Sequence, residues 1–304
     1  MPVAKGQKDS DNRALVAEFP MAAPRKKDSD VPDIKVDKLE ATQKIKIDGK
    51  LDEDAWKSAQ VLTFVDVKTG EPNTTFPVNG KGRLLWDDKS LFVAVEVEDK
   101  DVTGGFPADA KDPHLWTKDT VEVMIDPDWE KQNTNYYEIQ IGPQNLVFDS
   151  QWDDYNVPKP SPEGPFGNQE WSAGLKSAVV VDGTLDKSDD VDKGYVVEAA
   201  IPWKSFAKAK KSPPELGDSW RINLYAMEKN AGVAWSPILG RGNFHRSSRF
   251  GRVHWVKKGW APPAASGAAS AAPSGSAPAK ATAASAKPAS APAPAPKPTG
   301  STAP

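Results

Sequence analysis

Eleven tryptophans stand out in a chain that has no cysteine and only three histidines. Trp116, Trp152 and Trp235 fall in segments rich in Asp, Asn, Pro and Gly, which predicts that loops carry these three side chains outside the core. An indole that a loop presents to water is a costly apolar surface, and a flat ligand that stacks on the ring is the usual reason for it. The tryptophans inside or beside apolar patterns, which we expect in the core, are Trp56, Trp86 and Trp255.

The residue types that carry most enzyme chemistry are scarce. The lack of cysteine excludes thiolate nucleophiles, disulfides and Cys-zinc sites. The chain has no G-x-S-x-G, H-E-x-x-H, C-x-x-C-H or G-x-x-x-x-G-K-[ST] motif, and His114 and His254 have no metal partner at a recognisable spacing. Acidic pairs abound, but a glycosidase needs two carboxylates facing each other at about 5–9.5 Å, which a sequence does not show. The residues therefore favour a binding protein over an enzyme.

The elements that must position these side chains are strands. Ten short segments are rich in β-branched and aromatic residues and are separated by turn signals. Many lie too close together for crossover helices, so we expect an all-β fold, an antiparallel two-sheet β-sandwich of the jelly-roll type. One or two short helices are expected, at residues 52–56 with Asp52 as N-cap and at residues 202–206. The strand-like segments are 61–67, 82–86, 91–97, 120–125, 136–141, 146–148, 175–181, 195–201, 220–226 and 251–256.

Apolar and polar side chains alternate in residues 119–126, 136–141 and 220–227, so each strand has an apolar face and a hydrogen-bonding face. A solvated outer face is the common form of such a sheet. Carboxylate, amide and guanidinium groups flanked by aromatic loops favour a polyol-binding face instead. The residues expected to point inward are Val121, Val123, Ile125, Tyr137, Ile139, Ile141, Ile222, Leu224 and Ala226. The opposite face is expected to carry Glu122, Met124, Tyr136, Glu138, Gln140, Arg221, Asn223 and Tyr225.

Composition divides the chain into three parts. Residues 1–38 are polar and predicted to be largely disordered, residues 39–260 form the sandwich, and residues 261–304 are a disordered tail rich in Ala, Pro, Ser and Lys. The net charge of −3 argues against a nucleic-acid partner. No segment approaches the ~20 apolar residues of a membrane span, and no signal peptide is visible at the N-terminus.

An ordered series of motifs across residues 40–256 resembles the family 9 carbohydrate-binding modules and their wider relatives. Each motif alone is weak, and the whole series in order is specific. The motifs are IDGKLDEDAW at 47–56, LLWD at 84–87, LFVAVEV at 91–97, WTKDTVEVMID at 116–126, YYE at 136–138, GYVVEAAIPW at 194–203 and FHRSSRFG at 244–251.

The resemblance implies a β-sandwich that binds sugars, often chain ends, by clamping a ring between two aromatic side chains. Trp116 matches the first aromatic plate, and Phe244 stands where the best-described members have a second Trp. Glu122 and Asn223 match groups that bond sugar hydroxyls, whereas Gln140 replaces an Arg and so removes a two-pronged donor. The ligand-binding residues that the resemblance implies are Trp116, Glu122, Glu138, Gln140, Asn223, Phe244, His245 and Arg246.

A sugar suits these residue types physically. One face of a pyranose is a patch of C–H bonds that packs on an aromatic ring, and its edge offers vicinal hydroxyls to a carboxylate or amide. We therefore expect non-catalytic carbohydrate binding that supports polysaccharide recognition or breakdown by a separate enzyme. The resemblance places the protein outside the cell or in the cell envelope, with a saccharide ligand and the cell wall or a separate glycoside hydrolase as partners.

Three further interpretations stay open. Relatives carry structural calcium, and residues 99–101 and 189–192 offer Asp oxygens, although solvated Asp in turns is the commoner outcome. Sandwiches such as the haem subunit that accompanies ethylbenzene dehydrogenase hold haem between a Met and a Lys or His, and Met124 lies on the Glu122 face. A purely structural envelope protein is the third interpretation, with the Ala/Pro tail as its spacer.

Overall fold

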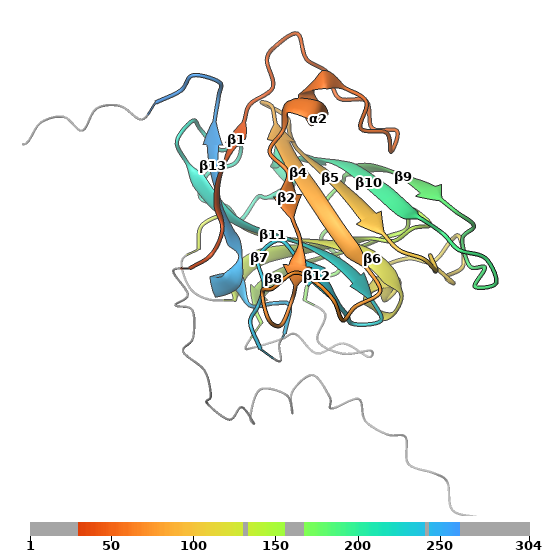
Figure 1. Cartoon of the computed structure of the whole chain (residues 1–304). Coiled ribbons are helices and arrows are strands. Elements are labelled where there is room, and N and C mark those ends of the chain that lie inside the picture. Colours follow the sequence, from red (N-terminus) through yellow and green to blue (C-terminus); the bar gives the residue numbers. More distant parts are fainter. Residues whose placement is uncertain (1–29, 130–132, 156–166, 241–242, 262–304) are drawn as a thin grey trace, which may run out of the picture. The chain divides into compact units, whose positions relative to one another are not determined.

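Two β-sheets that pack face to face make up the computed structural model, which describes residues 30–129, 133–155, 167–240 and 243–261 (Figure 1). The all-β sandwich expected from the sequence is confirmed. Residues 1–29 and 262–304 lie outside the described residues, so the disorder expected at both ends stays a prediction. No helix in the described ranges is long and apolar enough to cross a membrane.

The large sheet contains eight of the described strands. Their bounds are β1 Asp33–Asp37, β3 Val65–Asp66, β6 Asp119–Asp126, β7 Thr134–Ile141, β8 Val147–Asp154, β11 Ser219–Glu228, β12 Ala231–Ala234 and β13 Gly251–Val256. The strand order is β1-β13-β11-β6-β7-β8, and β12 pairs with both β11 and β3. All of these pairs are antiparallel except β1–β13, which is parallel.

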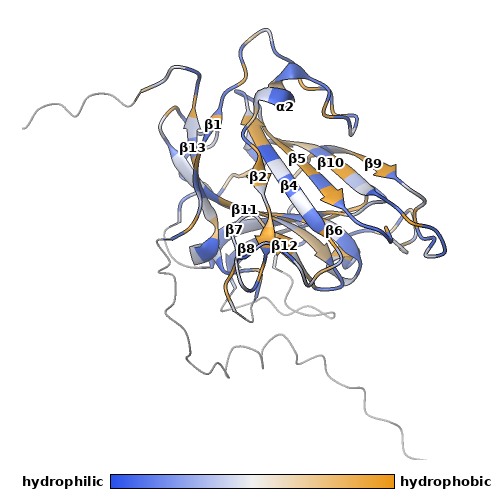
Figure 2. Cartoon of the chain, in the orientation of Figure 1, coloured by the Kyte–Doolittle hydropathy of each residue, from blue (hydrophilic) through white to orange (hydrophobic). Residues whose placement is uncertain are grey.

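The small sheet contains five of the described strands in the order β2-β4-β5-β10-β9. Their bounds are β2 Leu62–Thr63, β4 Asn79–Trp86, β5 Ser90–Glu98, β10 Gly194–Pro202 and β9 Lys176–Asp182. Hydrophobic and hydrophilic residues both occur along β4 and β5, as expected for strands that bury one face more than the other (Figure 2). The chain crosses between the sheets at Phe64, whose N–H donates to Gly80 O at 3.0 Å.

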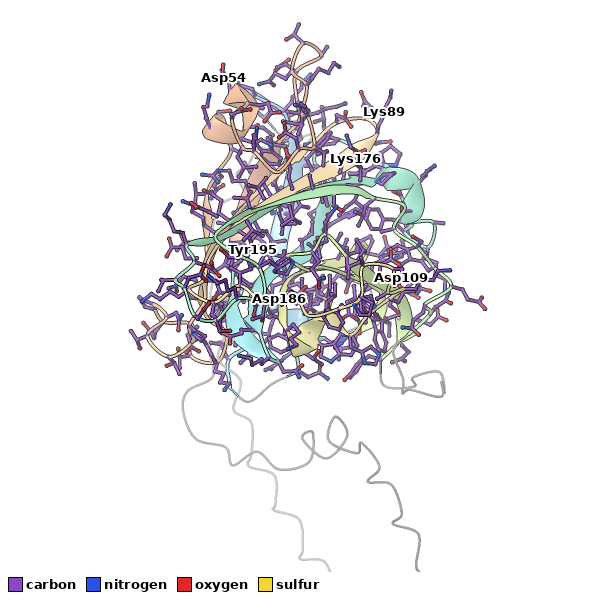
Figure 3. All side chains as sticks on the ribbon, turned by 90° about the vertical axis from the view of Figure 1, so that its right-hand side faces the viewer. Asp54, Lys89, Asp109, Lys176, Asp186 and Tyr195 are labelled. Atoms are coloured by element: carbon purple, nitrogen blue, oxygen red, sulfur yellow. The ribbon has the colours of Figure 1, made fainter. Side chains whose placement is uncertain are left out.

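Side chains fill the space between the two sheets (Figure 3). Every inward-pointing residue expected on β6, β7 and β11 belongs to this buried core, so the alternation predicted the inner face correctly. Trp86 and Trp255, which we expected in the core, lie 5.7 Å apart between ring centroids, and Trp203 and Trp220 join the same edge-to-face cluster. Such edge-to-face indole contacts add to the stabilisation from apolar burial.

The segment IDGKLDEDAW is tied to the small sheet by one buried carboxylate. Glu198 on β10 accepts hydrogen bonds from the backbone N–H of Asp48 and of Gly49 and from Trp56 Nε1, each at 2.9 Å. Gly49 has a φ of +78°, and a Cβ there would lie 2.7 Å from a methyl group of Val180. The Gly and the Trp of this motif therefore have a structural role. Both donate hydrogen bonds to Glu198, which lies far away in the sequence.

Three expectations about local structure were wrong in detail. Helix α2 spans Asp54–Ser58 with Glu53 rather than Asp52 at its N-cap, and the Glu53 carboxylate accepts from Lys46 N instead of capping the helix. Residues 33–37, assigned from composition to the polar N-terminal segment, form β1. Strand β12 was not expected, because Gly232 interrupts its pattern. The expected turn at 202–206 is present as the 3-10 turn η2, Trp203–Ser205.

Candidate functional site

The polar side chains of β6, β7 and β11 lie on the face of the large sheet that is turned away from the small sheet, which we call the outer face. This face is not solvated, although a solvated outer face is the common form of such a sheet. Its side chains are buried beneath a second apolar cluster, to which Trp116 and Phe244 also pack. The buried members of this cluster are Val67, Met124, Tyr136, Trp152, Tyr225, Met227, Ala234, Ile238 and Phe250.

Three polar side chains lie together in the middle of the outer face. The register of β6 and β7 places Glu122 directly opposite Gln140, and Glu138 lies two residues from Gln140 on the same face. Gln140 Nε2 donates to Glu138 Oε1 at 2.7 Å. Glu122 Oε1 and Gln140 Oε1 are both buried and have no hydrogen-bond partner among the described residues. This arrangement leaves two neighbouring acceptors without a donor, which a folded protein rarely tolerates unless a ligand or water completes them.

Burial controls the protonation of this pair of glutamates. Glu122 and Glu138 are only 2% and 4% exposed. Loss of hydration raises the pKa of Glu138 to about 7, while its hydrogen bonds from Trp152 and Gln140 oppose that rise. Loss of hydration, reinforced by the charge of Glu138, raises the pKa of Glu122 well above its usual range. Two adjacent glutamates that resist joint ionisation keep at least one carboxyl protonated near neutral pH, so the pair can both donate and accept hydrogen bonds.

Histidine 245 lies beside the glutamate pair without neutralising it. Its Nε2 is 3.8 Å from Glu138 Oε2, and its Nδ1 is 2.8 Å from the Tyr136 hydroxyl. Burial lowers the pKa of His245 to about 3, so the imidazole is neutral at pH 7 and the contact with Glu138 is not an ion pair. The Tyr155 ring stacks on the imidazole at 4.5 Å between centroids, which holds His245 in place.

Trp116 is presented by the 3-10 turn η1, Leu115–Thr117. Leu115 is buried against Gly142, where a Cβ would come within 3.1 Å of it, and Asn230 N donates to Trp116 O at 2.8 Å. The His114 imidazole stacks on the Trp116 ring at 4.4 Å, and Phe148 meets the ring edge-on at 5.1 Å. The indole is thus partly exposed and held through both its ring and its backbone.

Phe244 and Arg246 belong to the loop that covers the outer face from the β11 side. The Tyr225 hydroxyl donates to Phe244 O at 3.0 Å, and the two rings meet edge-to-face at 5.2 Å. Arg246 Nη1 donates to Ile238 O at 3.1 Å and so ties this loop to the preceding one. Phe244 remains partly exposed, like Trp116. The structure therefore brings both expected aromatic plates to the rim of the same cluster.

Asn223 does not present its amide at the site, contrary to the expectation. It is 0% exposed, its Nδ2 donates to Ser236 O, and its Oδ1 accepts from the N–H of Ser236 and of Leu224. These bonds fasten the segment after β12 onto β11. The position of Asn223 along its strand predicted the correct face of the sheet. It could not show that the loop after β12 already occupies the Asn223 amide with hydrogen bonds.

Trp152 and Trp235 are buried, which corrects the expectation from their polar neighbours; Trp152 lies in β8, and Trp235 lies just after β12. Trp152 points to the outer face from β8, and its Nε1 donates to Glu138 Oε2 at 2.9 Å. Trp235 packs on Gly251, where a Cβ would come within 2.5 Å of the ring. Trp152 is thus a site residue that the sequence analysis missed. The alternation of Phe148, Ser150 and Trp152 along β8 was the signal that could have revealed it.

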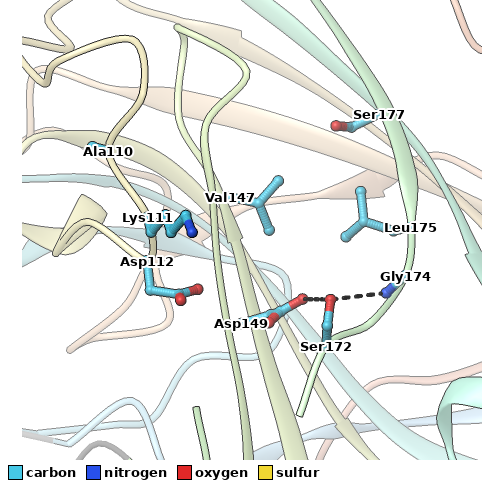
Figure 4. A pocket seen from close by; sticks show the side chains of 9 residues that line it. All are labelled: Ala110, Lys111, Asp112, Val147, Asp149, Ser172, Gly174, Leu175 and Ser177. Atoms are coloured by element: carbon cyan, nitrogen blue, oxygen red, sulfur yellow. Dashed lines mark hydrogen bonds between the residues drawn. The ribbon is translucent and has the colours of Figure 1, made fainter. Parts of the chain in front are cut away.

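A separate hollow lies away from the glutamate pair, between β8 and the start of β9 (Figure 4). Asp149 faces it and accepts hydrogen bonds from Ser172 Oγ at 3.2 Å and from Ala173 N at 2.7 Å. No aromatic ring is among its lining residues, so it offers a sugar no stacking surface. The lining residues are Ala110, Lys111, Asp112, Val147, Asp149, Ser172, Gly174, Leu175 and Ser177.

The residues considered for calcium fit a metal only in part. Asp99, Asp101 and Asp190 each have a buried carboxylate oxygen without a hydrogen-bond partner among the described residues, and so does Asp119. Asp192, in contrast, accepts from the N–H groups of two loop residues. Within the described ranges no three acidic or histidine side chains converge closely enough to hold an ion. The side chains alone are therefore an incomplete ligand set, and we assign no function to a metal there.

Sequence relatives of this chain are carbohydrate-active enzymes of much greater length. Exoglucanase XynX of Acetivibrio thermocellus is 31% identical over 160 residues, which cover 53% of this chain and 12% of that protein. Endo-1,4-β-xylanase A of Thermotoga neapolitana is 30% identical over 218 residues, which cover 69% of this chain and 17% of that protein. The chain thus spans less than a fifth of the length of these relatives.

Solved structures with a similar fold have low sequence identity to this chain. A proposed carbohydrate-binding protein from Bacteroides uniformis is 16% identical with a TM-score of 0.54, over 74% of this chain and 99% of that one. A carbohydrate-binding module of family 9 from Caldicellulosiruptor kristjanssonii, in complex with cellotriose, is 17% identical with a TM-score of 0.48, over 76% of this chain and 100% of that one. The first of these likenesses supports the sandwich fold alone.

The family model described as carbohydrate family 9 binding domain-like matches residues 47–258. This range runs from the IDGKLDEDAW motif to the end of β13 and includes both aromatic plates and the glutamate pair. Because the match covers more than half of the chain, the protein belongs to the carbohydrate family 9 binding domain-like family.

Proposed function

We propose that this domain binds a saccharide without catalysing a reaction, with one sugar ring held between Trp116 and Phe244. The observation that carries the proposal is the pair of unpartnered acceptors, Glu122 Oε1 and Gln140 Oε1, on directly opposed residues of the outer face, where Trp116 and Phe244 pack against the apolar cluster. Vicinal hydroxyls of a pyranose would donate to both oxygens at once. The resulting bonds would relieve two buried groups that otherwise destabilise the fold.

The placement of the carboxylates favours binding over hydrolysis. In a glycosidase the acid and its partner carboxylate flank the scissile bond. Glu122 and Glu138 instead lie side by side on neighbouring strands of one sheet, so both would approach a sugar from the same side. Incubation with cellulose, xylan and their oligosaccharides should release no reducing ends, and measurable release would contradict this part of the proposal.

The haem interpretation gains no support, because Met124 is fully buried in the outer-face cluster, with Asn223 and Glu138 as its register partners. We place the protein outside the cell or in its envelope, beside a separate glycoside hydrolase, because its relatives are far longer proteins named as xylanases and exoglucanase. In that setting the domain would hold a polysaccharide chain near an enzyme that cuts it.

Saccharide affinity should rise with pH across the range in which the Glu122 carboxyl ionises. A sugar hydroxyl donates best to an ionised Glu122, so the ligand stabilises the ionised form and lowers the pKa of that carboxyl in the complex. A shift of one pKa unit is a tenfold change in affinity. The other titratable groups that face Glu122 are Glu138, with a pKa of about 7, and Tyr136, Tyr225 and His245, which are neutral across this range.

Titration calorimetry on the full chain with glucose, cellotriose and xylotriose at pH 5, 6, 7 and 8 tests this dependence. Glu122→Gln removes one ionisable acceptor, so its affinity should be weaker at pH 8 and should depend less on pH than that of the unmodified chain, with Glu138 as the remaining titrating group of the pair. Glu96→Gln is the matched control, because Glu96 is on β5 of the small sheet and pairs with Lys81 and Arg83. An affinity that falls with pH in the unmodified chain, or the same pH profile in Glu122→Gln, would contradict the assigned role of Glu122.

A further inference from the structure

Trp129 is the one aromatic side chain among the strongly exposed large hydrophobic residues of the described ranges. It is 45% exposed and lies in the turn that follows β6. Neither the aromatic plates nor the glutamate pair includes it. A single exposed apolar residue needs no explanation by itself, so the way in which the chain holds this ring decides whether it has a function.

The Trp129 ring is held rigidly from behind. The Arg221 guanidinium lies 4.1 Å from the ring centroid, and Arg221 is itself buried, with Nη1 donating to Phe250 O at 2.8 Å. Trp129 N donates to the buried carboxylate of Asp126 at 2.8 Å, in a backbone conformation with a φ of +41°. A left-handed conformation is unfavourable for a tryptophan. The backbone of Trp129 is thus held in a strained conformation in which the Trp129 ring packs on Arg221 while nearly half of the side chain stays exposed.

The surroundings of Trp129 are polar rather than apolar. The preceding residue, Asp128, accepts a hydrogen bond from Lys210 N at 2.9 Å, and Arg252 lies opposite Arg221 in the ladder. A protein partner would need a contiguous apolar patch at the centre of its interface. One aromatic ring among charged and hydrogen-bonding groups matches a sugar instead, which has a C–H face to stack and hydroxyls at its edge.

Trp129 lies on the same face of the large sheet as the proposed clamp. Asp126 and Arg221 are register partners, and each shares its strand's outer-face parity with Glu122 and Tyr225. Trp116 precedes β6 and Trp129 follows it, so the length of β6 separates them, about 23 Å for seven steps of about 3.3 Å. That separation is several sugar rings long, so a monosaccharide in the clamp could not reach Trp129.

We infer that Trp129 is a second stacking platform, which binds a distant sugar ring of the same polysaccharide chain whose end the Trp116–Phe244 clamp holds. The inference rests on the proposed saccharide function and adds a dependence on chain length. A ligand that spans both rings binds at the second one with a high effective concentration, so the gain appears only for long chains.

The experiment compares the full-length protein with Trp129→Ala, Trp129→Phe and Trp260→Ala. Calorimetry with glucose, cellotriose, cellohexaose, xylotriose and xylohexaose gives affinities in solution, and depletion assays on insoluble cellulose and xylan add long chains. Trp129→Ala should bind glucose and the trisaccharides like the unmodified protein but bind cellohexaose or xylohexaose and the insoluble glycans about tenfold more weakly. Trp129→Phe should restore most of the loss. Trp260, which follows β13 and packs on Gly217, serves as the matched tryptophan control.

The possible failures are distinguishable. If Trp129→Ala binds every ligand as the unmodified protein does while Trp116→Ala does not, the second platform is wrong and the clamp stands. If Trp129→Ala weakens binding of glucose and hexasaccharides equally, Trp129 supports the clamp or the fold, and the inference is again overturned. If the unmodified protein binds none of these glycans, the proposed function fails and this inference fails with it.

Discussion

Replacing Trp116 with alanine is expected to weaken saccharide binding by about 30-fold or more, which corresponds to about 2 kcal/mol, the scale of aromatic hot spots in binding sites. The substitution removes one stacking surface and leaves the buried acceptors of Glu122 and Gln140 in place. The melting temperature should fall by no more than about 4 °C, because the partly exposed ring contributes about 1 kcal/mol of packing on Phe148 and His114. Titration calorimetry and a melting curve on the same sample measure both quantities.

Phe244→Trp provides the complementary test. The larger ring should hold or improve affinity, since it restores the plate found in the best-described relatives and extends from a loop position that Tyr225 already fixes. If Trp116→Ala unfolds the domain and no ligand is bound even by the unmodified protein, Trp116 is a structural cap over Phe148. The family likeness would then describe the fold only.

Protein stability without a ligand or divalent cation should decrease by at least about 3 kcal/mol between pH 6 and pH 8. Burial raises the pKa of Asp119, Asp126 and Glu138 to about 7 each in the folded state. The folded protein therefore binds more protons than the unfolded chain between about pH 4 and pH 7. The free energy of unfolding is highest at the acidic end of that window and is lost as the pH rises through 7.

The size of this effect follows from proton linkage. From pH 6 to pH 8 each of the three carboxyls removes about one pKa unit, or about 1.4 kcal/mol, for a total of about 4 kcal/mol. His245 acts in the opposite direction, since burial lowers its pKa to about 3 while the unfolded imidazole still takes up protons at pH 6. It offsets about 1 kcal/mol of the loss.

Urea unfolding in the presence of a chelator at pH 6, 7 and 8 measures the predicted change. Asp119→Asn should reduce the pH dependence by about 1 kcal/mol, because Asn retains an acceptor for the N–H and hydroxyl of Thr103 without the ionisation. Glu96→Gln should leave the dependence unchanged. A stability that rises from pH 6 to pH 8 would contradict the prediction and would show that these carboxyls ionise readily in the folded state.

The sequence predicted the inner half of this sandwich far better than the outer half. Period-2 alternation placed Val121, Ile139 and Leu224 in the core because burial between two sheets demands strict parity. The same parity identified the outer face but could not show that distant loops cover it. A loop-covered polar face and a solvated one have the same pattern, and only the folded structure shows that Glu122 is 2% exposed.

The same reason explains the misassigned residues at the site. Asn223 and Trp152 are both on the outer face, yet each already has partners there, Ser236 for the amide and Glu138 for the indole N–H. These partners are many residues away in the sequence, so no local pattern encodes them. Trp116, Phe244 and Glu122 were located by family resemblance, and the structure places them around one buried cluster.

A glycan array probed in parallel with the full-length protein and with Trp116→Ala tests the central claim most directly. The array should include plant, bacterial and chitinous glycans, because the residues do not specify the sugar. The account predicts that the unmodified protein binds a subset of these glycans and that Trp116→Ala loses that signal while remaining folded. A flat signal for the unmodified protein across all glycans, or the same positive pattern for both proteins, would contradict saccharide binding at the Trp116–Phe244 clamp.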